Sequence, residues 1–415
     1  MRKIKDSGVA WVGAMPEDWT VKRGKFTLKL LNRPVKDTDD VITCFRDGEV
    51  TLRTNRRTDG FTVSVKEIGY QGIEPGDLVI HGMDGFAGSI GISDSRGKSS
   101  PVLVVCDTDE SKRYIMYYLR SMAYNDVFTA LATGIRVRSC DLRWNKLAEL
   151  PYILPSLPEQ NQIVSAIESN TSKVDALIAN VQAQIEKLKA YKQSLITEVV
   201  TKGLDPNAPM KDSGVEWIGT IPVSWKTIRV KQLLRERKER SVNGKEEPLS
   251  MSQKVGLVPT KMLDMIPNMA SSFVGAKLAY VDDLVFNKLK AHLGVFSVSK
   301  YDGLVSPDYA VYYSTGIIDL KYLEYLFKTP QCISEFRKRS TGIAAGLTRL
   351  YTDGLFAIEC PMPSKDEQAE IVLFLNEKCA QIDELMSLKQ TKIEKLEQYK
   401  RSLIYEYVTG KKEVS

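Results

Sequence analysis

The sequence predicts an α+β protein in which two homologous mixed α/β domains are held apart by two long antiparallel helices. The helices are expected to form an intramolecular coiled coil with pseudo-two-fold symmetry. Three observations predict this fold: a long helical stretch occurs twice, a tryptophan-containing segment occurs twice, and framework positions between them repeat in order. The expected divisions are 1–155 and 204–363 for the domains, and 156–203 and 364–415 for the helices.

The repeated helical stretch is the strongest signal. Residues 156–203 return as residues 364–410, at an offset of 208 from the start of the stretch to Ile196 and Ile404. Each copy opens with a Ser-x-x-Glu pattern, ending at Glu159 or Glu367, which predicts a capping box with reciprocal hydrogen bonds. Each copy closes on a glycine, the residue that most easily adopts the left-handed conformation after a helix. Both stretches are therefore expected to be single helices, each reaching roughly 65–70 Å.

Apolar residues recur along both helices with alternating four- and three-residue steps, which is typical of a coiled-coil seam. Lys192 is the one position of the first seam that is not apolar. A lone amphipathic helix is more often ordinary core packing, but two matched seams in one chain can bury each other. The seam positions are Val174, Ile178, Val181, Ile185, Leu188, Leu195 and Val199, then Ile382, Met386, Ile393, Leu396, Leu403 and Tyr407.

Composition restricts the class of protein. The length of 415 residues predicts two or three domains, and 43% hydrophobic with 27% charged residues is typical of a soluble globular protein. No leader-like or membrane-spanning apolar run is seen, so a cytoplasmic location is expected. The net charge of +6 permits binding to a polyanion without requiring it. Six cysteines without C-x-x-C spacing are expected to be reduced and buried: Cys44, Cys106, Cys140, Cys332, Cys360 and Cys379.

The domains also repeat internally. The Trp-, Pro- and Gly-containing segment 6–19 returns as 212–225 at an offset of 206, which predicts an anchored irregular segment packed on each domain. Strands are expected in the apolar runs at 76–80 and 101–105 and in their copies, and short helices at 114–123 and 320–328. The framework repeats while the residues between its positions diverge. This pattern is typical of one scaffold that carries two different recognition surfaces.

Chain order predicts the topology. If residues 212–360 form a compact domain, the second helix starts where the first ends and runs back antiparallel to it. By the same symmetry, the N-terminal tryptophan segment should lie near the end of the second helix.

No catalytic motif is evident: the chain has no P-loop, no G-x-G-x-x-G opening a helix and no H-E-x-x-H. The only two histidines, His81 and His292, are isolated in sequence and are interpreted as surface or groove residues. The glycines between 82 and 91 are better explained by tight turns, and Asp282-Asp283 by turn chemistry at a strand start. The protein is therefore expected to position a substrate for the active site of another protein.

Polar and basic loops supply the candidate contact residues, although for any single residue a solvated loop surface is an equally good interpretation. Arginine and asparagine side chains are suited to phosphate and base-edge contacts. The mixed-charge run 235–240 is expected to be an exposed helix face. The DNA-contact candidates are Arg53, Asn55, Arg56, Arg57, His81, Thr133, Arg136, Arg138, Arg143, Ser252, Gln253, Lys254, Lys288, Lys290, His292, Thr341 and Arg349. The residues from the second copy are expected to stand in loops comparable to those of the first.

These residues carry a family resemblance. The segment Asp-Ser-Gly-Val-x-Trp-(Ile/Val)-Gly-x-x-Pro-x-x-Trp, the helix start Leu-Pro-x-x-Glu-Gln-x-x-Ile at 157–163 and the run Ser-Leu-Ile-Thr-Glu-Val-Val-Thr-Lys-Gly at 194–203 resemble the specificity (S) subunit of type I restriction–modification systems. The likeness spans essentially the whole chain. The second helix start departs from it by reading Ser364-Lys365-Asp366 before Glu367-Gln368, and 340–342 keeps only part of its repeat, so local contacts there stay open.

The resemblance implies a non-catalytic DNA-binding chain whose two target-recognition domains each read one half of a bipartite, asymmetric target. The helices would set the unspecified spacer and dock two methyltransferase (M) subunits. S-adenosylmethionine would be held by those partners, which would flip and methylate an adenine at N6 in each half-site. Motor-nuclease (R) subunits would use ATP and magnesium, so this chain itself is expected to bind neither cofactor nor metal.

Two other classes remain open at this point. A structural coiled-coil adaptor that never touches DNA is compatible with the mild charge, and salt-dependent DNA binding would exclude it. An enzyme such as a nuclease would have to show turnover by the purified chain.

Overall fold

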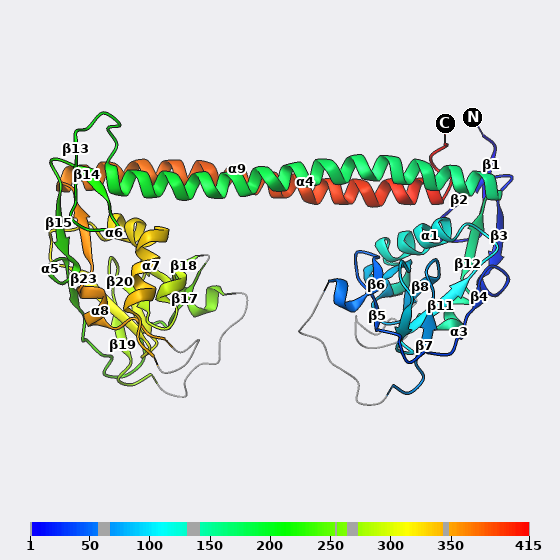
Figure 1. Cartoon of the computed structure of the whole chain (residues 1–415), viewed down its shortest axis with the longest axis horizontal. Coiled ribbons are helices and arrows are strands. Elements are labelled where there is room, and N and C mark those ends of the chain that lie inside the picture. The colour runs from blue at the N-terminus through cyan, green and yellow to red at the C-terminus, as the bar shows by residue number, and fades with distance from the viewer. Residues whose placement is uncertain are drawn as a thin grey trace. The chain divides into compact units, whose positions relative to one another are not determined.

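The structure is a computed structural model that describes residues 2–56, 67–130, 142–253, 255–263, 273–342 and 348–414. The chain divides into two compact units (Figure 1). Unit 1 combines Met1–Gln182 with Gln390–Ser415, and unit 2 is Ala183–Lys389. Two long helices, α4 (Leu157–Lys202) and α9 (Lys365–Val408), each contribute to both units.

Unit 1 contains a series of short strands followed by helices. In chain order these are β1 (Ile4–Asp6), β2 (Ala14–Pro16), β3 (Thr20–Arg23), η1 (Gly24–Phe26), β4 (Lys29–Leu30), β5 (Ile42–Cys44), β6 (Val50–Leu52), η2 (Arg53–Asn55), β7 (Gln71–Ile73), β8 (Leu78–His81), η3 (Gly85–Ala87), β9 (Ile90–Ile92), β10 (Gly97–Ser99), β11 (Leu103–Asp107), α1 (Lys112–Tyr124), α2 (Val127–Ala130), α3 (Trp144–Leu147) and β12 (Pro151–Leu154).

Unit 2 repeats this strand order and its pairing element by element, which confirms the predicted duplication. Its elements are β13 (Met210–Asp212), β14 (Thr220–Pro222), β15 (Lys226–Arg229), α5 (Val230–Leu233), β16 (Leu234–Glu236), β17 (Leu249–Ser252), β18 (Gly256–Pro259), η4 (Thr260–Met262), β19 (Lys277–Ala279), β20 (Leu284–Asn287), η5 (Ala291–Leu293), β21 (Phe296–Val298), β22 (Gly303–Val305), β23 (Tyr309–Ser314), α6 (Leu320–Phe327), α7 (Pro330–Arg339), α8 (Thr352–Phe356) and β24 (Glu359–Met362). The strands and short helices expected from the sequence at 76–80, 114–123, 320–328 and their copies are present as β8, α1, α6 and β20.

A four-stranded antiparallel sheet forms the centre of each unit, in the order β4-β11-β8-β9 and β16-β23-β20-β21. Successive side chains of a strand point to opposite faces. In β8, Leu78 and Ile80 join the core beneath α1, whereas Val79 joins a second core with Ile42 and Val50 of the β5–β6 hairpin. Burial on both faces explains why these strands read as continuous apolar runs rather than alternating ones.

The long helices pack against each other as an antiparallel coiled coil. Lys400 Nζ of α9 lies 2.7 Å from Asp175 Oδ1 of α4 in unit 1, and Lys192 Nζ lies 2.6 Å from Asp383 Oδ1 in unit 2. Later residues of α4 therefore lie beside earlier residues of α9, so the two helices run antiparallel. The two lysines occupy seam positions, so ion pairs replace apolar packing where the heptad pattern is interrupted.

Glutamate and glutamine at the start of each long helix attach the domain to it. Trp19 Nε1 donates to Glu159 Oε2 at 3.1 Å in unit 1. Gln160 accepts from Ser111 N at 2.9 Å, just before α1. Unit 2 has the same pair of contacts, with Trp225 Nε1 to Glu367 Oε2 at 2.8 Å and the amide before α6 bonded to Gln368.

This arrangement corrects the predicted reciprocal capping box. The hydroxyl half is present in the second copy, where Ser364 Oγ accepts from Glu367 N at 3.2 Å. The carboxylates of Glu159 and Glu367, however, accept the indole N–H of the tryptophan segment. A buried indole N–H requires an acceptor, and the first helical turn favours a negative charge. The predicted glycine ends are confirmed, since Gly203 and Gly410 have φ of 80° and 72°.

The C-terminal end of a long helix also packs on each unit: that of α9 on unit 1 and that of α4 on unit 2. In unit 1, Tyr114 Oη donates to Val408 O at 3.1 Å and lies 2.8 Å from Ile153 O of β12. In unit 2, Tyr322 Oη donates to Val200 O at 2.9 Å. The N-terminal tryptophan segment lies at the end of α9, because a Cβ on Gly410 would come within 3.0 Å of Trp19. This position confirms the placement predicted from internal symmetry.

The mixed-charge run 235–240 is not a helix face, so that prediction is wrong. Its first residues belong to the edge strand β16, which pairs with β23. Leu233 and Leu234 are buried before it. Arg237 N then donates to Val311 O at 2.8 Å. Its side chain pairs with the buried Asp283, with Nε 2.7 Å from Oδ2, and Asp283 also accepts from Tyr280 N. The turn chemistry predicted for this aspartate is therefore accompanied by an ion pair.

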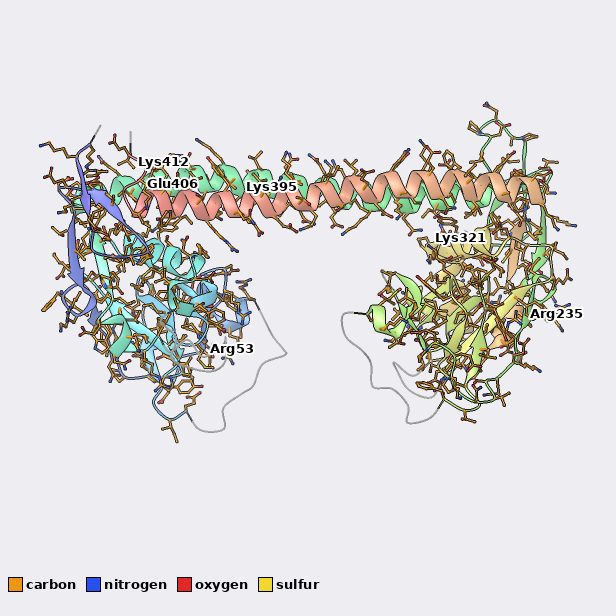
Figure 2. All side chains as sticks on the ribbon, turned by 180° about the vertical axis from the view of Figure 1, so that it is seen from behind. Arg53, Arg235, Lys321, Lys395, Glu406 and Lys412 are labelled. Carbon is orange, nitrogen blue, oxygen red and sulfur yellow. The ribbon has the colours of Figure 1, made fainter. Side chains whose placement is uncertain are left out.

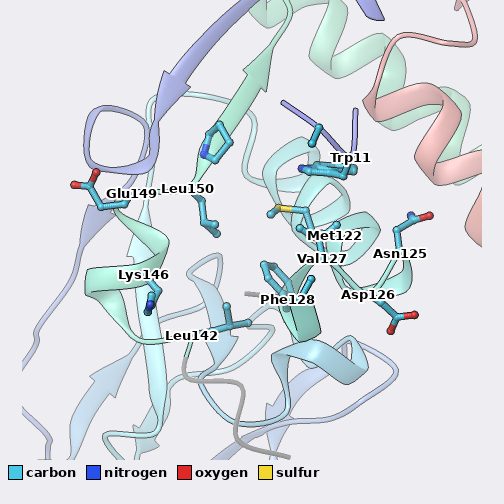
Figure 3. A pocket seen from close by; sticks show the side chains of 13 residues that line it. Trp11, Met122, Asn125, Asp126, Val127, Phe128, Leu142, Lys146, Glu149 and Leu150 are labelled. Atoms are coloured by element: carbon cyan, nitrogen blue, oxygen red, sulfur yellow. The ribbon is translucent and has the colours of Figure 1, made fainter. Parts of the chain in front are cut away.

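The two units differ between their second and third helices. Unit 1 has a cavity of about 670 Å³ whose wall includes Trp11, Met122 and Phe128 (Figure 3). In unit 2, α7 packs closely on α8, since a Cβ on Gly354 would lie 3.1 Å from Arg339 O. Lys146 occupies the corresponding place in unit 1, where its side chain lines the cavity.

Candidate nucleic-acid interface

Three loops meet in unit 1, on the side away from α4 and α9, where Figure 2 shows Arg53. Arg46 Nη2 of the β5–β6 turn lies 3.0 Å from Asp84 Oδ1, which precedes η3. Gly91 lets the same turn approach β9, since a Cβ there would lie 1.9 Å from Gly48 O. Leu142 N, before α3, donates to Gly82 O at 2.9 Å. The sheet thus brings three sequence-distant loops into one surface.

The corresponding loops meet in unit 2 through different side chains. Gln253 Nε2 of the β17–β18 turn donates to Leu293 O of η5 at 3.2 Å. Leu350 N donates to Lys288 O at 3.0 Å, matching the Leu142 contact. Thr341 and Arg349 pair through both backbone hydrogen bonds, at 3.0 and 2.9 Å. The backbone framework repeats while the exposed side chains change, as expected for two recognition surfaces of different specificity.

The predicted contact residues of the β6–η2 region differ in how their side chains are bonded. Arg53 opens η2 and donates from Nε to Thr43 Oγ1 at 3.3 Å. Asn55 donates to Thr51 Oγ1 at 2.8 Å. Arg56 is bound more tightly, because its Nη1 lies 2.7 Å from Asp47 Oδ2 and 2.9 Å from Glu49 Oε2, with the guanidinium 4.3 Å from the Phe45 ring centroid. Arg56 therefore shapes the hairpin turn.

His81 ends β8 and serves its turn. Its Nδ1 accepts from the amides of Met83 and Asp84, at 3.3 and 3.0 Å. Burial lowers its pKa, with a smaller opposing effect of Asp84, so the imidazole is neutral at pH 7. At the equivalent place in unit 2, Asn287 Oδ1 accepts from Leu289 N at 3.1 Å. A neutral acceptor in this turn is thus common to both units.

Several predicted residues lie outside the described part of the chain. They are Arg57, Thr133, Arg136, Arg138 and Lys254. Arg143 is described, and it is exposed immediately before α3. The residue next to it, Leu142, makes the backbone contact that brings this segment into the loop surface.

In unit 2 the predicted residues cluster around the end of β20. Lys290 is exposed, and His292 lies within η5, where its Nδ1 is buried with no hydrogen-bond partner among the described residues. Arg349 Nη2 lies 3.2 Å from Asp308 Oδ1. Ser252 and Gln253 lie in or beside the β17–β18 turn, one element earlier than the η2 position of Arg53. They therefore correspond in position to the β5–β6 turn of unit 1 and not to η2.

Positive charge accumulates beside this cluster. Lys277 of β19 donates from Nζ to Tyr309 O at 2.6 Å. Burial lowers the pKa of Lys277, and the nearby charges of Lys288 and Arg240 lower it further. A bound anion would relieve this repulsion, so the surface suits a phosphate. At the equivalent position of unit 1, Gln71 makes the same contact, to Leu103 O at 3.0 Å.

Sequence reasoning missed Arg46 and Lys277 as members of the two surfaces. Arg46 stands in an Arg-Asp-Gly turn, a pattern that predicts a hairpin and could have placed it beside the β8 turn. Lys277 had no local signal, because its neighbours are supplied by strands distant in sequence. No group of three or more His, Cys, Asp or Glu side chains that could hold a metal ion is found among the described residues. Within the same ranges, none of the helices has both the length and the apolar character needed to cross a membrane.

Comparisons with known proteins give a consistent relationship. No protein-family model matches the sequence. The type I restriction enzyme MjaVIII specificity subunit of Methanocaldococcus jannaschii is 23% identical over 420 residues, covering 96% of this chain and 93% of the relative. The MjaX protein of the same archaeon, also a type I restriction specificity subunit by name, is 26% identical over 318 residues, covering 72% and 67%.

A chain from a solved structure, described as showing complex assembly and conformational transition of the type I R-M system, has the same fold. It superposes with a TM-score of 0.69 at 14% identity, covering 95% of this chain and 98% of that chain. The duplicated units, the antiparallel helix pair and the sequence relatives agree with one another. This chain is thus similar in sequence to proteins named as type I restriction enzyme specificity subunits, and it shares its fold with a chain from a solved type I R-M system.

Proposed function

We propose that this chain selects the DNA sequence for a type I restriction–modification complex. Residues 1–155 and 204–363 would each read one half of a bipartite, asymmetric target, and 156–203 with 364–415 would set the spacer. The observation that carries the proposal is the repeated loop surface: each unit places three loops on one framework, with different side chains in the two copies. A pseudo-symmetric protein with two such surfaces can read an asymmetric site.

The proposed DNA contacts come from these loop surfaces. In unit 1 they are Arg53, Asn55 and Arg143, with Arg57, Thr133, Arg136 and Arg138 nearby in sequence. In unit 2 they are Ser252, Gln253, Lys254, Lys288, Lys290, His292, Thr341 and Arg349. Arg56 and His81 are better assigned to holding turns, because carboxylates engage the first and backbone amides the second.

Exposed apolar residues on the helix pair support docking of a partner. Leu177 and Tyr399 of unit 1 are 52% and 53% exposed, and Tyr191 and Leu385 of unit 2 are 57% and 42% exposed. Each of these residues directly precedes a seam position, so they flank the seam on one side. The two pairs are related by the internal repeat. We propose that each pair docks one methyltransferase subunit.

The chemistry would belong to the partners. Methyltransferase subunits would hold S-adenosylmethionine and extrude the target adenine, and motor-nuclease subunits would bring ATP and magnesium. The solved type I complex with the same fold supports assembly with such subunits. A coiled-coil adaptor that never touches DNA is disfavoured, because both sequence relatives are named as specificity subunits.

The adenine methylome tests this proposal directly. Cells that express the chain with the methyltransferase of its own system would be compared with cells that lack only this chain. A two-part motif with N6-methyladenine in each half, present only with the chain, is the expected result. A methyltransferase that binds the chain yet produces no chain-dependent motif would contradict the specificity role. Absence of any bound methyltransferase would instead contradict the docking role.

A further inference from the structure

In unit 2, a groove lies at a place that side chains occupy in unit 1. The groove has a volume of about 650 Å³ and lies between the last turns of α4, the tryptophan segment and the start of α7. Its lining includes Gln193 and Thr197 of α4, Trp217, and Thr329 and Pro330. All of these residues belong to unit 2. The Thr197 hydroxyl turns back to its own helix and donates to Gln193 O at 2.8 Å, so this side chain does not fill the space.

Two side chains fill the corresponding place in unit 1. Tyr405, at the repeat position of Thr197, has its ring centroid 6.2 Å from that of Trp11. Arg401, at the repeat position of Gln193, lies over the Tyr124 ring at 5.1 Å. Trp11 is also 5.3 Å from Tyr118, whose repeat position is Leu326. Among the described residues, Trp217 therefore lacks the ring partners that Trp11 has.

Two backbone carbonyl groups beside the groove also differ between the units in their hydrogen bonds. In unit 1, Tyr405 Oη donates to Trp11 O at 3.2 Å, and Lys411 Nζ donates to Val12 O at 2.7 Å. The equivalent carbonyls in unit 2 are those of Trp217 and Ile218. Across the described residues, no donor reaches either of them. The groove thus presents a ring-sized space beside two acceptors, one for a hydroxyl and one for an ammonium group.

We propose that this groove binds a tyrosine side chain, with a neighbouring lysine or arginine, from a partner polypeptide. The ring would pack on Trp217, its hydroxyl would donate to Trp217 O, and the cation would donate to Ile218 O. Because Tyr405 occupies the place in unit 1, only one of the two units accepts this insertion. The partner is thereby bound asymmetrically by a chain whose framework is duplicated.

The occupant rests on the proposed function, because the groove is continuous with the proposed docking patch. Tyr191 of that patch adjoins Ala190, which lines the groove. Glu198, exposed on the groove wall, adds a negative charge that favours a cationic segment. The expected partner is therefore the methyltransferase subunit that lies on the unit 2 patch.

Tyramine, a phenol with an ammonium group, is the probe for the groove. Methyl NMR of Ile218 is expected to show a saturable shift in the wild-type chain and in Thr197→Ser, which keeps the groove open. Thr197→Tyr copies the side chain of unit 1 and is expected to abolish the shift. Gln331→Trp, placed on the exposed first turn of α7, covers the same groove from the other side and guards against misfolding of the first variant. No saturable shift in the wild type, or an equal shift in both blocked variants, would overturn the site.

The methyltransferase complex tests the occupant. Bound methyltransferase is expected to remove the tyramine shift, and both blocked variants are expected to weaken its binding by about 30-fold or more, as for a central aromatic anchor. If the methyltransferase binds wild type and blocked variants equally, the groove inference fails while the proposed function stands. If it does not bind the wild-type chain, the proposed function and the occupant both fail.

Discussion

Neighbouring arginines in the β5–β6 region of unit 1 differ in what they can offer DNA. Arg56 lies between Asp47 and Glu49, and these carboxylates raise its pKa and occupy its donors. Arg53 donates from Nε to the hydroxyl of Thr43 at 3.3 Å. A guanidinium that is already paired with two carboxylates interacts less with an incoming phosphate or base. Arg53 is therefore the stronger candidate of the two.

Replacement of Arg53 tests this assignment. Arg53→Ala is expected to weaken DNA binding of the assembled complex by about 1–3 kcal/mol if Arg53 contacts a base, and to relax one position of the target. A phosphate contact would instead weaken all sequences evenly and reduce the salt slope by about one. Binding titrations at several salt concentrations distinguish the two cases.

Arg23→Ala is the matched control for this measurement. Arg23 lies in β3 of the same unit, is exposed and pairs with Glu149 at 3.0 Å. Its replacement is expected to leave binding unchanged. Equal losses from both variants would mean that the long-range charge of the unit matters, and not the η2 contact.

The residue scale also shows what sequence can and cannot predict. The Glu-Gln pair at each helix start was visible as a repeat, and its position at a helical N-terminus was predicted correctly. Its actual partners, Trp19 and Ser111 in unit 1, were not, because they are far away along the chain. A capping box joins residues within one helix start, whereas here the glutamate accepts from a tryptophan that is distant in sequence. The same reasoning applies to Lys277, whose neighbours come from distant strands.

At the scale of elements, two of the seam lysines, Lys192 and Lys400, are the clearest testable feature. Lys192 and Lys400 interrupt the apolar seam and pair with Asp383 and Asp175. Exposed ion pairs contribute about 0–1 kcal/mol, whereas a seam leucine contributes more by burial. Polar seam residues, however, specify register. The double variant Lys192→Leu, Lys400→Leu is expected to raise the free energy of unfolding by about 1–2 kcal/mol and to promote association between chains.

Chemical denaturation and light scattering measure the two effects. Lys189→Leu is the control, since Lys189 is exposed, lies outside the seam and pairs with Glu186 of its own helix. Its effect is expected to stay within about 0.5 kcal/mol. A seam variant less stable than the wild type would show that the ion pairs stabilise the helix pair more than leucine packing does.

The exposed patches on the helices carry a second element-scale prediction. Leu177→Asp with Leu385→Asp is expected to reduce methyltransferase binding, because each replacement introduces a charge into a proposed apolar contact. A loss of about 2 kcal/mol per site is typical of a central interface residue. Calorimetry with the purified methyltransferase measures it. Ala176→Asp, one position away and also exposed, should bind normally. Unchanged binding of the double variant would exclude this face.

The elements themselves were mostly predictable, and the exception is informative. Continuous apolar runs, glycine turns and heptads predicted the sheet strands and both long helices. The charged run at 235–240 was misread as a helix, because charge alone carries no period. The buried pair Leu233-Leu234 before it and the partner strand β23 decide its extended conformation.

At the scale of the whole molecule, the helices are proposed to act as a ruler. Removing one heptad from each helix at matched levels, residues 182–188 and 387–393, shortens the pair by about 10 Å. The spacer of the DNA target is then expected to shrink by about three base pairs, because base pairs rise about 3.4 Å each. The half-sites are expected to stay the same. The adenine methylome of cells with the shortened chain measures both quantities at once.

The control for this variant replaces the same two heptads by others of equal length. Its spacer is expected to equal that of the wild type. A shortened chain that methylates the original spacer would rule out the ruler, and a change in the half-sites would show that the helices also influence recognition.

The discontinuous make-up of unit 1 has a consequence for synthesis. Its core includes Leu403, Ile404, Tyr407 and Val408 of α9, all buried against residues from the first part of the chain. Unit 2, in contrast, is one uninterrupted stretch. During translation, residues 1–182 emerge early, but the core of unit 1 is complete only after residues 390–408 have been synthesised. At about 5–20 residues per second this delay is on the order of 10 s or longer. The nascent first domain therefore exposes an apolar surface throughout the synthesis of the second, and a chain cut short before residue 390 leaves that surface open to chaperones and proteases.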